Sequence, residues 1–333
     1  MTFTLIICTY MRPNALLVLL NSVAVQTLYP NEILIVDGSL NSETEQILKE
    51  QPFKNLVYHK VDDQHSGLTK QRNYGISKVN RHSQVICFLD DDTKLNEAYF
   101  QEVITVFEKH NSVVGVGGVA TNENRWQKVE KNTYYSKFKY YKLDGYVVEE
   151  GLRNRLRNYL YLQSEMLPNQ MPEFSHGRTC GYPLNNKIYE VDLLIGMSFS
   201  FRASVFRYIQ FSTYFEGYGL YEDADFSIRS QKYGKNVIVT SATLEHFHDS
   251  GGRPNMYKYG KMVIRNGWYV WRLKHPNPHL IANLKWHLVH FLLFSIRLMN
   301  VFTTTKRSEA LNDAAGRFVG WLSLVFNKPK VTL

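Results

Sequence analysis

Cysteine is scarce in this chain of 333 residues. The three that are present, Cys8, Cys87 and Cys180, show no Cys-x-x-Cys spacing and cannot all form pairs. This argues against a disulfide framework and a zinc knuckle, and it favours a reducing compartment. A basic leader is also lacking, because an apolar strand pattern follows Met1 almost directly. We therefore expect no signal peptide and a cytoplasmic location.

Acidic residues are scarce in the last quarter of the chain. Residues 251–333 contain 13 Lys or Arg and 2 Asp or Glu, whereas residues 1–250 contain 26 basic and 28 acidic residues. The formal net charge of +9 therefore arises entirely from the last quarter. Such asymmetry indicates an anionic partner, either a membrane surface or a nucleic acid. We disfavour nucleic acid, because the basic residues are interleaved with a long apolar stretch instead of forming a polar basic face.

Unbroken apolar runs long enough to cross a bilayer, which takes about 20 residues, are also lacking. Instead, the stretch 286–302 contains the apolar run 288–296, and the basic residues Lys285, Arg297, Lys306 and Arg307 flank this run. This pattern is typical of a helix that lies in the plane of an anionic membrane, here at its inner face. The alternative is a C-terminal helix that packs on the catalytic domain or on a second subunit of a homo-oligomer.

Strand-like and helix-like patterns alternate over the first 120 residues. Apolar residues make up 44% of the chain, so a large core can form. The alternation predicts βαβ units and an α/β fold with a mostly parallel, twisted sheet. We interpret residues 1–250 as one domain with halves 1–120 and 121–250 and an irregular insertion at 121–190, and residues 251–333 as a basic, partly amphipathic helical extension. The expected strands are 4–8, 32–36, 56–61, 85–89, 113–120, 193–201 and 236–240, and the expected helices are 14–26, 42–50, 68–79, 96–109 and 222–233.

Three consecutive aspartates, Asp90, Asp91 and Asp92, end the apolar strand pattern at 85–89. Three carboxylates cannot all stay ionised in a dry site without a partner, and a divalent cation is a suitable one. Alternate residues of an extended stretch face the same side, so we expect Asp90 and Asp92 to point into one site and Asp91 away from it. The alternative is a helix cap, but a run of three directly after a buried strand favours a magnesium or manganese site.

Other polar residues lie at the ends of predicted elements. Asp37 follows the second strand, where a carboxylate can accept a hydrogen bond from a base or a ribose. Its alternative role is that of a turn residue. Lys70 and Arg72 lie in the first turns of the third predicted helix, where a bound diphosphate would offset their conflict with the helix dipole; a solvated face is the alternative. His246 and His248 follow the last strand, two positions apart, and are candidate metal ligands or structural residues.

A second acidic pair opens the last helix of the predicted α/β domain. Glu222 and Asp223 follow a Gly-rich loop and suit the positive end of a helix. A carboxylate in such a corner is well placed to act as a general base. Asp225 and Arg229 fit an i,i+4 ion pair on the helix surface, so we interpret Asp225 as structural.

Together these motifs resemble the inverting glycosyltransferases of family 2, which have the GT-A fold. The resemblance runs from Thr4 to about Arg272. Each motif alone is weak, whereas their order and spacing are specific. The matching stretches are Leu5–Tyr10 with Arg12, Glu32–Ser39, Gly67–Gly75, Phe88–Asp92, Gly196–Phe206 and Gly217–Gly234.

This resemblance implies roles for individual residues. It implies that Asp223 is the catalytic base and that Glu222 binds the acceptor or supports the site. It also implies that Thr9 and Asp37 line the nucleoside pocket, although many members carry two acidic residues where this chain has Asp37 alone. The implied nucleotide-sugar set is Thr9, Tyr10, Arg12, Asp37, Lys70, Arg72, Asn73, Asp90 and Asp91. The implied metal set is Asp90, Asp92, His246 and His248.

The implied activity is metal-dependent, inverting transfer from a nucleoside-diphosphate sugar, by default a uridine one, to a hydroxyl acceptor. The acceptor would be a saccharide or a lipid-linked saccharide in surface polysaccharide synthesis. The rival class is a metal-dependent phosphohydrolase or nucleotidyltransferase that uses the same aspartates. A phosphohydrolase leaves Glu222 and Asp223 unexplained, and a sugar nucleotidyltransferase would need a Gly-rich basic loop where Thr9–Pro13 stands.

Overall fold

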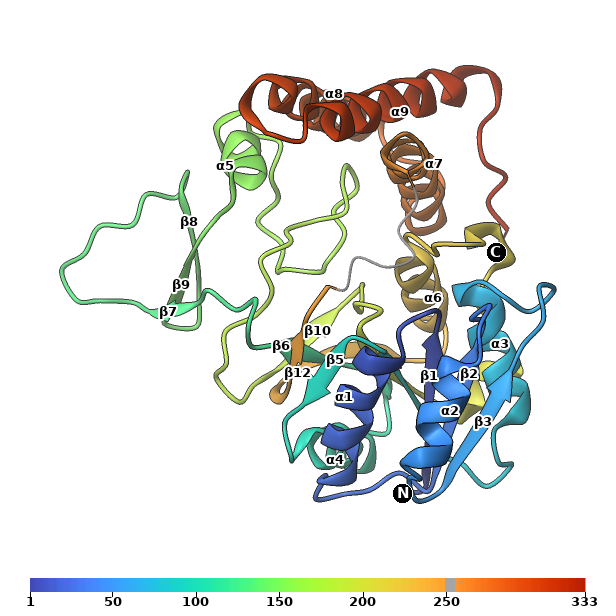
Figure 1. Ribbon diagram of the computed structural model, residues 1–333. Coiled ribbons are helices and arrows are strands. Elements are labelled where there is room, and N and C mark those ends of the chain that lie inside the picture. The colour runs from blue at the N-terminus through green and yellow to red at the C-terminus, as the bar shows by residue number, and fades with distance from the viewer. Residues whose placement is uncertain (249–254, 333) are drawn as a thin grey trace. The chain divides into compact units, whose positions relative to one another are not determined.

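The computed structural model describes residues 1–248 and 255–332, which divide into two compact units (Figure 1). The first unit combines Met1–Asn124 with Leu184–Arg253, and the second combines Arg125–Pro183 with Pro254–Leu333. The second unit thus joins most of the segment predicted as an insertion to the basic C-terminal region. Sequence order alone does not indicate this grouping.

A nine-stranded sheet forms the centre of the described part of the first unit. Its strands are β1 (Phe3–Thr9), β2 (Glu32–Asp37), β3 (Leu56–Lys60), β4 (Val85–Asp90), β5 (Thr93–Leu95), β6 (Val113–Ala120), β10 (Ile188–Val191), β11 (Ser198–Arg202) and β12 (Lys235–His246). The strand order is β10-β12-β6-β11-β4-β1-β2-β3, with β5 paired to β12. Strands β3, β2, β1 and β4 run parallel, as do β6 and β12, whereas β11 is antiparallel to β4 and β6. The predicted mostly parallel α/β sheet is therefore confirmed.

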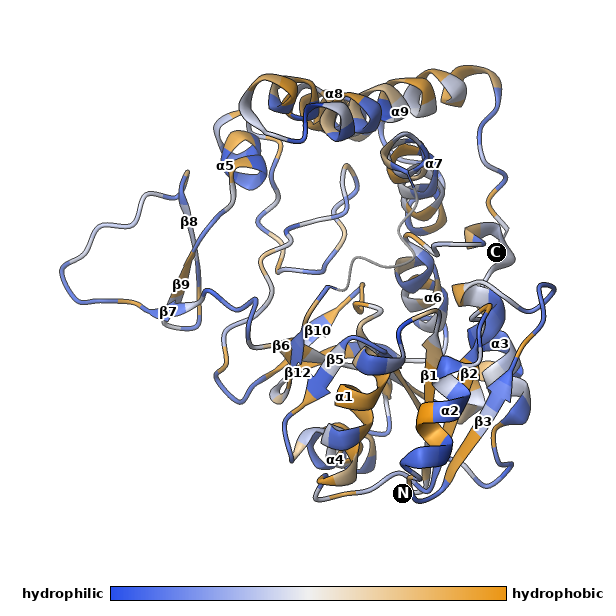
Figure 2. Cartoon of the chain, in the orientation of Figure 1, coloured by the Kyte–Doolittle hydropathy of each residue, from blue (hydrophilic) through white to orange (hydrophobic). Residues whose placement is uncertain are grey.

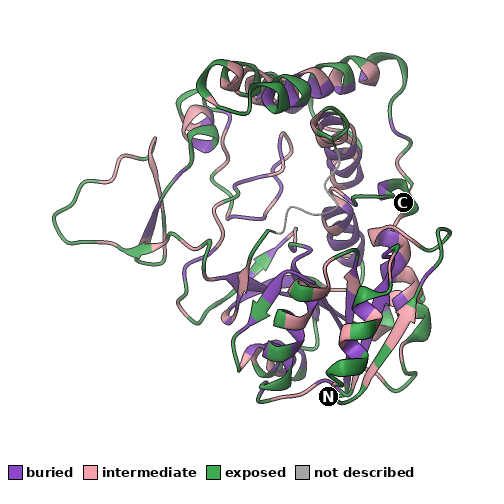
Figure 3. Ribbon diagram, viewed as in Figure 1, coloured by how far each residue is buried: buried purple, intermediate pink, exposed green. Residues whose placement is uncertain are grey.

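The side chains of β1 show how the sequence builds the core. Phe3, Leu5 and Ile7 alternate along the strand, so they share one face, and they join the buried cluster that includes Leu16 and Leu19 of α1. Figure 3 shows that the strands of this sheet are largely buried. The helices of this unit are α1 (Pro13–Ala24), α2 (Glu43–Glu50), α3 (Leu68–Lys78), α4 (Tyr99–Lys109) and α6 (Glu222–Ser230).

Two elements near the aspartates differ from their predicted bounds. The helix predicted at 96–109 begins only at Tyr99, after a turn in which the Tyr99 amide donates to the Asn96 carbonyl at 3.0 Å, and the residues directly after the aspartates form the short strand β5. This strand pairs with the end of β12, which extends the strand predicted at 236–240 as far as His246. The prediction missed both features because a pairing between segments so distant in sequence leaves no local pattern.

The second unit contains regular elements within the segment predicted to be irregular. A three-stranded sheet of order β7-β9-β8 and helix α5 lie there, so the segment is irregular only in part. In the C-terminal part, Trp271 stacks on Trp286 with ring centroids 4.8 Å apart, in a cluster with Ile264 and Leu324. The elements are β7 (Gln127–Lys128), β8 (Tyr140–Leu143), β9 (Tyr146–Glu149), α5 (Leu152–Tyr159), α7 (Met256–Lys274), α8 (Leu280–Thr303) and α9 (Arg307–Phe326).

Among the described residues, helix α8 alone is long and apolar enough to cross a membrane, judged by length and composition. It has 24 residues and runs from Leu280 to Thr303. This finding concerns the whole helix and does not contradict the expectation from the sequence, which concerned unbroken apolar runs. Polar residues such as Asn283 and Lys285 interrupt the apolar runs but do not interrupt the helix.

Strand β6 needs glycine for close packing. A Cβ atom on Gly118 would lie 2.7 Å from the carbonyl oxygen of Ala242 and 2.8 Å from the ring of Tyr99. Neither the strand backbone nor the buried ring can move without disturbing its own packing.

We expect Gly118→Ala to lower the free energy of unfolding by about 1–3 kcal/mol, the range for an overpacked core. Urea unfolding followed by circular dichroism would measure the change. The control is Gly151→Ala, because nothing lies within 4 Å of its Cβ and its φ is −61°. Equal stability of the Gly118 variant and the wild type would contradict this account.

Candidate functional site

Polar side chains meet at one edge of the sheet, where the parallel strands end. Because β11 is antiparallel to both β4 and β6, strands β6 and β12 run in the same direction as β4, β1 and β2. Ligands of open α/β sheets bind at this carboxyl edge. Thr9, Asp37, Asp90 and His246 each close one of these strands. Residues predicted from separate motifs therefore share one edge.

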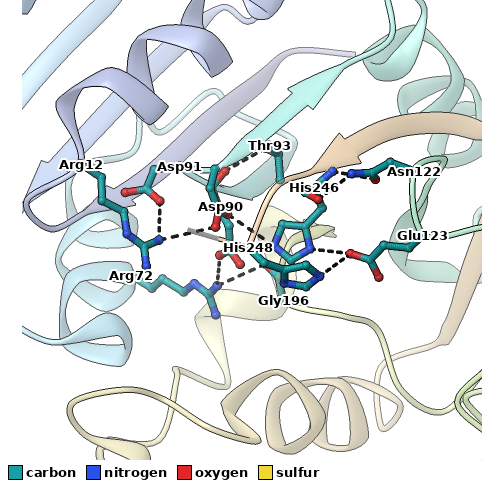
Figure 4. Close-up of polar contacts among 11 residues, drawn as sticks. Arg12, Arg72, Asp90, Asp91, Thr93, Asn122, Glu123, Gly196, His246 and His248 are labelled. Atoms are coloured by element: carbon teal, nitrogen blue, oxygen red, sulfur yellow. Dashed lines mark hydrogen bonds and ion pairs between the residues drawn. The ribbon is translucent and has the colours of Figure 1, made fainter. Parts of the chain in front are cut away.

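A group of three predicted metal ligands lies at this edge (Figure 4). The ligand atoms of Asp90, Asp92 and His246 lie within 4.8 Å of one another, and Nε2 of His246 is 3.4 Å from Oδ1 of Asp92. The backbone fixes this arrangement, because His246 pairs with Thr93 in the β5–β12 ladder and the Phe247 amide donates to the Asp92 carbonyl at 3.0 Å.

Asp91 has different partners from its two neighbours. Its Oδ2 accepts a hydrogen bond from Thr9 Oγ1 at 2.7 Å, and its Oδ1 accepts one from Arg12 at 3.0 Å. Arg12 also lies 3.6 Å from Asp92. Three residues of the predicted nucleotide-sugar set, Thr9, Arg12 and Asp91, therefore form one internal network beside the metal-ligand group.

Glu123, which the sequence analysis did not predict, completes the site on the other side of His246. Its Oε1 lies 3.0 Å from Nδ1 of His246 and 2.7 Å from Nε2 of His248, and these three residues form a second group able to hold an ion (Figure 4). The side chain of Asn122 bonds the backbone of His246 in both directions. The available signal was position: Asn122 and Glu123 follow a buried parallel strand, as Asp90 does.

Asp37 is fully buried and holds the loops around it. Its Oδ1 accepts a hydrogen bond from the Ser39 amide at 2.7 Å, and its Oδ2 accepts one from the Tyr58 hydroxyl at 2.8 Å. Lys60 Nζ lies 3.8 Å from the same oxygen. Tyr10, after β1, is exposed. Contact of Asp37 or Tyr10 with a nucleoside stays a prediction.

Arg72 is buried and links three parts of the unit. It forms a close ion pair with Glu222, lies 3.5 Å from Asp90 and donates to the Gly196 carbonyl at 3.3 Å. Its guanidinium also lies 4.7 Å from the ring centroid of Phe199. With its side chain 3% exposed, Arg72 contacts the site through Asp90 and Glu222. These contacts indicate a positioning role for a residue that was predicted to contact the nucleotide.

Other residues of α3 also hold the backbone around the site. Asn73 donates to the Phe211 carbonyl at 2.8 Å and accepts from the Phe211 amide at 2.9 Å, so its amide group is engaged within the chain. Gln71, which was not predicted, donates to the Thr9 carbonyl at 3.0 Å and to the Val36 carbonyl at 2.8 Å, and so joins the ends of β1 and β2. Lys70 is partly exposed, 3.8 Å from a carboxylate.

Asp223 lies in the first turn of α6 with its carboxylate held by amides. Oδ2 accepts from the Gly196 amide at 3.0 Å, and Oδ1 accepts from the Ala224 amide at 2.8 Å. Tyr221, the residue directly before α6, has a φ of 72°. This left-handed conformation is uncommon outside glycine and clusters at functional sites. The carboxylate therefore has a fixed orientation in a sharp corner, as expected of a general base.

The Asp225–Arg229 pair forms as predicted but not on the surface. The two side chains make a close ion pair, and Asp225 is fully buried. The prediction of a surface pair is therefore wrong. Helix α6 is therefore buried on more sides than its sequence indicates. Two charged residues look like surface positions in a sequence pattern, but as an ion pair they can pack inside the protein.

Burial shifts the protonation of several site residues. It raises the pKa of Asp90 to about 6 and that of Asp91 to about 6. The neighbouring cations, Arg72 beside Asp90 and Arg12 beside Asp91, act to lower these pKa values but do not outweigh burial. It also raises the pKa of Asp223. For His246 burial acts to lower the pKa, but hydrogen bonds to Asp92 and Glu123 outweigh it and raise the pKa to about 9.

The donor set fits a divalent cation. Carboxylate oxygens suit magnesium and manganese, and an imidazole in the same group favours manganese or another transition metal. Because the pKa of His246 is raised, its imidazole carries a proton at neutral pH in the chain alone. A cation that binds to this imidazole would have to displace that proton.

Comparison with known proteins supports the family resemblance. Residues 4–165 match the model of glycosyl transferase family 2. A search of curated proteins returned no match. The fold is similar to that of S. aureus TarS residues 1–349, with a TM-score of 0.54 and 14% identity over 98% of this chain and 81% of that chain.

A second similar structure is that of GalNAc-T7 with UDP, GalNAc and Mn2+. Its TM-score is 0.51 at 14% identity, over 80% of this chain and 48% of that chain. This chain therefore spans about half the length of GalNAc-T7. At this identity both likenesses concern the fold, and they agree with the predicted GT-A architecture.

We expect the Arg72–Glu222 pair to be coupled in stability. Arg72→Met should lower the free energy of unfolding by about 3–5 kcal/mol, because it leaves Glu222 buried without its cation. Adding Glu222→Gln should restore part of the loss, since the uncompensated charge is removed. Urea unfolding of the double-mutant cycle would measure the coupling. Strictly additive losses would contradict it.

Proposed function

Residues 4–165 carry the sequence pattern of glycosyltransferase family 2, and on this premise we propose that the chain is a metal-dependent, inverting glycosyltransferase. The donor is a nucleoside-diphosphate sugar, and the acceptor offers a hydroxyl group. The observation that carries the proposal is the convergence of Asp90, Asp92 and His246 at the carboxyl edge of the sheet. Arg72 joins this group to Glu222, next to the proposed base Asp223.

The proposed cation site uses residues of two distant segments. Asp90 and Asp92 from the end of β4 and His246 from the end of β12 would hold manganese or magnesium. His248 lies nearby, because it contacts Glu123 beside His246. When bound, the cation supplies a Lewis acid that neutralises the charge of the departing diphosphate. The similar GalNAc-T7 structure was solved with UDP and Mn2+, which supports manganese and a uridine donor here.

Residues at the ends of β1 and β2 would bind the donor. Thr9, Tyr10 and Asp37 lie at or beside these ends, and we propose that they face the nucleoside. Arg12 and Lys70 carry positive charge suited to the diphosphate. Arg12 already lies between Asp91 and Asp92, so it would balance these carboxylates in the absence of donor.

Asp223 would remove the proton of the acceptor hydroxyl. Its two oxygens accept hydrogen bonds from backbone amides and retain lone pairs for a third donor. The acceptor oxygen forms a bond to the anomeric carbon, the bond to the diphosphate oxygen breaks, and the proton passes to Asp223. Attack opposite the leaving group inverts the anomeric centre. The raised pKa of Asp223 makes it a stronger base than an ordinary aspartate.

The acceptor class is proposed from the family resemblance, and the charge of the C-terminal region supports an acceptor at a membrane. We propose a saccharide or a lipid-linked saccharide in surface polysaccharide synthesis, with the enzyme at the cytoplasmic face of a membrane. The basic excess of residues 251–333 supports this location, because it attracts anionic lipid. The phosphohydrolase and nucleotidyltransferase alternatives have no comparable support from the family match.

We expect Asp223→Asn to reduce glycosyl transfer by at least about 100-fold, as for removal of a general base. Nucleotide binding should survive, because the donor residues are untouched. A panel of nucleotide sugars with manganese would report transfer, and calorimetry with UDP and manganese would report binding. Asp62→Asn, a change at an exposed carboxylate, is the matched control. Near-normal turnover of the Asp223 variant would exclude it as the base.

Manganese binding should strengthen as pH rises. Below its pKa of about 9, His246 is protonated, and a cation must displace that proton. The affinity should therefore rise about tenfold per pH unit between pH 7 and pH 8.5, with release of about one proton. Calorimetry in buffers of different ionisation enthalpy would measure both quantities.

His246→Ala is the control for this pH dependence. It should bind manganese more weakly and with a flatter pH profile, because the titrating ligand is gone. A wild-type affinity that does not change across this pH range would contradict the role of His246 as a ligand.

A further inference from the structure

Helix α8 has an apolar stripe that faces outward. The stripe consists of Ile281, Leu284, Leu288, Phe291, Leu298 and Phe302, all exposed. Their spacing of three, four or seven residues places them on one side of the helix. Figures 2 and 3 show that α8 and α9 are rich in hydrophobic residues and have exposed parts along their length. Because such stripes normally face a core, an outward one indicates a partner.

Helix α9 has a matching outward stripe, formed by Leu311, Phe318, Leu322 and Val325. The two stripes border the seam between the helices. Phe291 of the α8 stripe lies 6.2 Å from the ring of Trp321 in α9, and Phe318 lies 5.9 Å from the ring of Phe294 in α8. The helices therefore present one continuous apolar surface, which we call the hairpin face.

The opposite side of the hairpin already has its partners. Trp286 is fully buried and stacks on Trp271 of α7. Arg297 of α8 bonds Asp313 of α9 at 2.9 Å, and Trp321 donates to His287 at 2.8 Å. The hairpin is thus held within its own unit by one side, so the hairpin face is not the side that fixes the helices in the unit.

The C-terminal part of the second unit, which carries the hairpin face, is strongly positive. Residues 255–332 contain 12 Lys or Arg and 2 Asp or Glu. One of the two acids, Asp313, is buried and paired with Arg297 and Arg317, which leaves Glu309 as the exposed acid among these described residues. Lys306 and Arg307 lie at the turn of the hairpin, and Lys328 and Lys330 follow α9.

We propose that the hairpin face docks in the plane of an anionic lipid bilayer, with its apolar stripes in the acyl boundary and its lysines and arginines at the headgroups. This combination of apolar side and basic rim is that of an interfacial helix. The proposal specifies how the membrane location given under the proposed function would arise, and it is independent of the transfer chemistry at the sheet edge.

Two other occupants fit less well. A second copy would bring the same basic residues against each other, because a twofold interface repeats one surface, and like charges oppose association. A spanning α8 would leave Lys285 and Arg297 in or near the hydrocarbon and would separate Arg297 from Asp313. An anionic bilayer accommodates both kinds of residue, because its acyl boundary takes the apolar side chains and its headgroups take the basic ones.

The test is flotation of the full chain with vesicles of neutral phosphatidylcholine and with vesicles that also contain phosphatidylserine. We expect binding to the anionic vesicles that weakens as salt rises from about 50 to about 500 mM. Leu284→Glu with Phe302→Glu should reduce binding at least about tenfold, because each removes a buried apolar side chain. The matched control, Val25→Glu with Tyr134→Glu, changes two similarly exposed apolar residues elsewhere and should bind as wild type.

Each contrary outcome overturns the proposal. Absence of binding to anionic vesicles, or equal loss in the control variant, would exclude a specific lipid surface. A dimer by light scattering that the Leu284–Phe302 variant abolishes, without vesicle binding, would assign the hairpin face to a second copy. Binding that resists high salt and requires detergent for release would indicate a spanning α8. Unchanged circular dichroism and unchanged calorimetric manganese binding would show that the variants remain folded.

Discussion

The buried guanidinium of Arg72 is the constraint on which the candidate site depends. A buried cation loses its hydration, and it stays in the interior only when several partners replace that water. Here the partners come from separate parts of the chain: Glu222 of α6, Asp90 of β4, the carbonyl of Gly196 and the ring of Phe199. Satisfying one charge therefore sets the distance between the end of β4 and the start of α6. That distance is the one over which a donor and an acceptor would have to meet.

Around this point, charges of opposite sign alternate through the site. Arg12 lies beside Asp91 and Asp92, Asp92 beside His246, and His246 beside Glu123. Each carboxylate of this series has a cationic neighbour, so the first unit does not need a bound ion to tolerate the acidic residues it collects at the sheet edge. A divalent ion would then replace an existing positive charge, the proton of His246, and the net change in local charge on binding would be smaller than the charge of the ion.

Local pattern was enough to predict the strands that carry Asp37 and Asp90, because short apolar runs followed by polar residues identify buried parallel strands. Asp90 and Asp92 share one ligand group as expected, although strand β4 ends at Asp90 and Asp92 lies in the turn that follows, so the period of two does not explain their proximity. The position of Glu123 after a buried strand is visible in the sequence, but its contacts with His246 and the positioning contacts of Arg72 could not be predicted. They depend on β12 lying next to β5 and on α6 packing near α3, which are pairings between remote segments. The strands of the segment 121–190 were missed for a different reason. They are so short that their alternation of apolar and polar residues is too brief to detect.

The β5–β12 ladder gives the proposed ion site a property beyond its donor set. Thr93 and His246 are register partners in an antiparallel pair, and the Phe247 amide bonds the carbonyl of Asp92. Two ligands that are remote in sequence are therefore connected by one rung of backbone hydrogen bonding. The separation of their backbones is therefore a property of sheet geometry, and only the side-chain rotamers remain to be set. An ion bound there would meet donors whose backbones were already ordered during folding, so this part of the conformational entropy would not be lost again on binding.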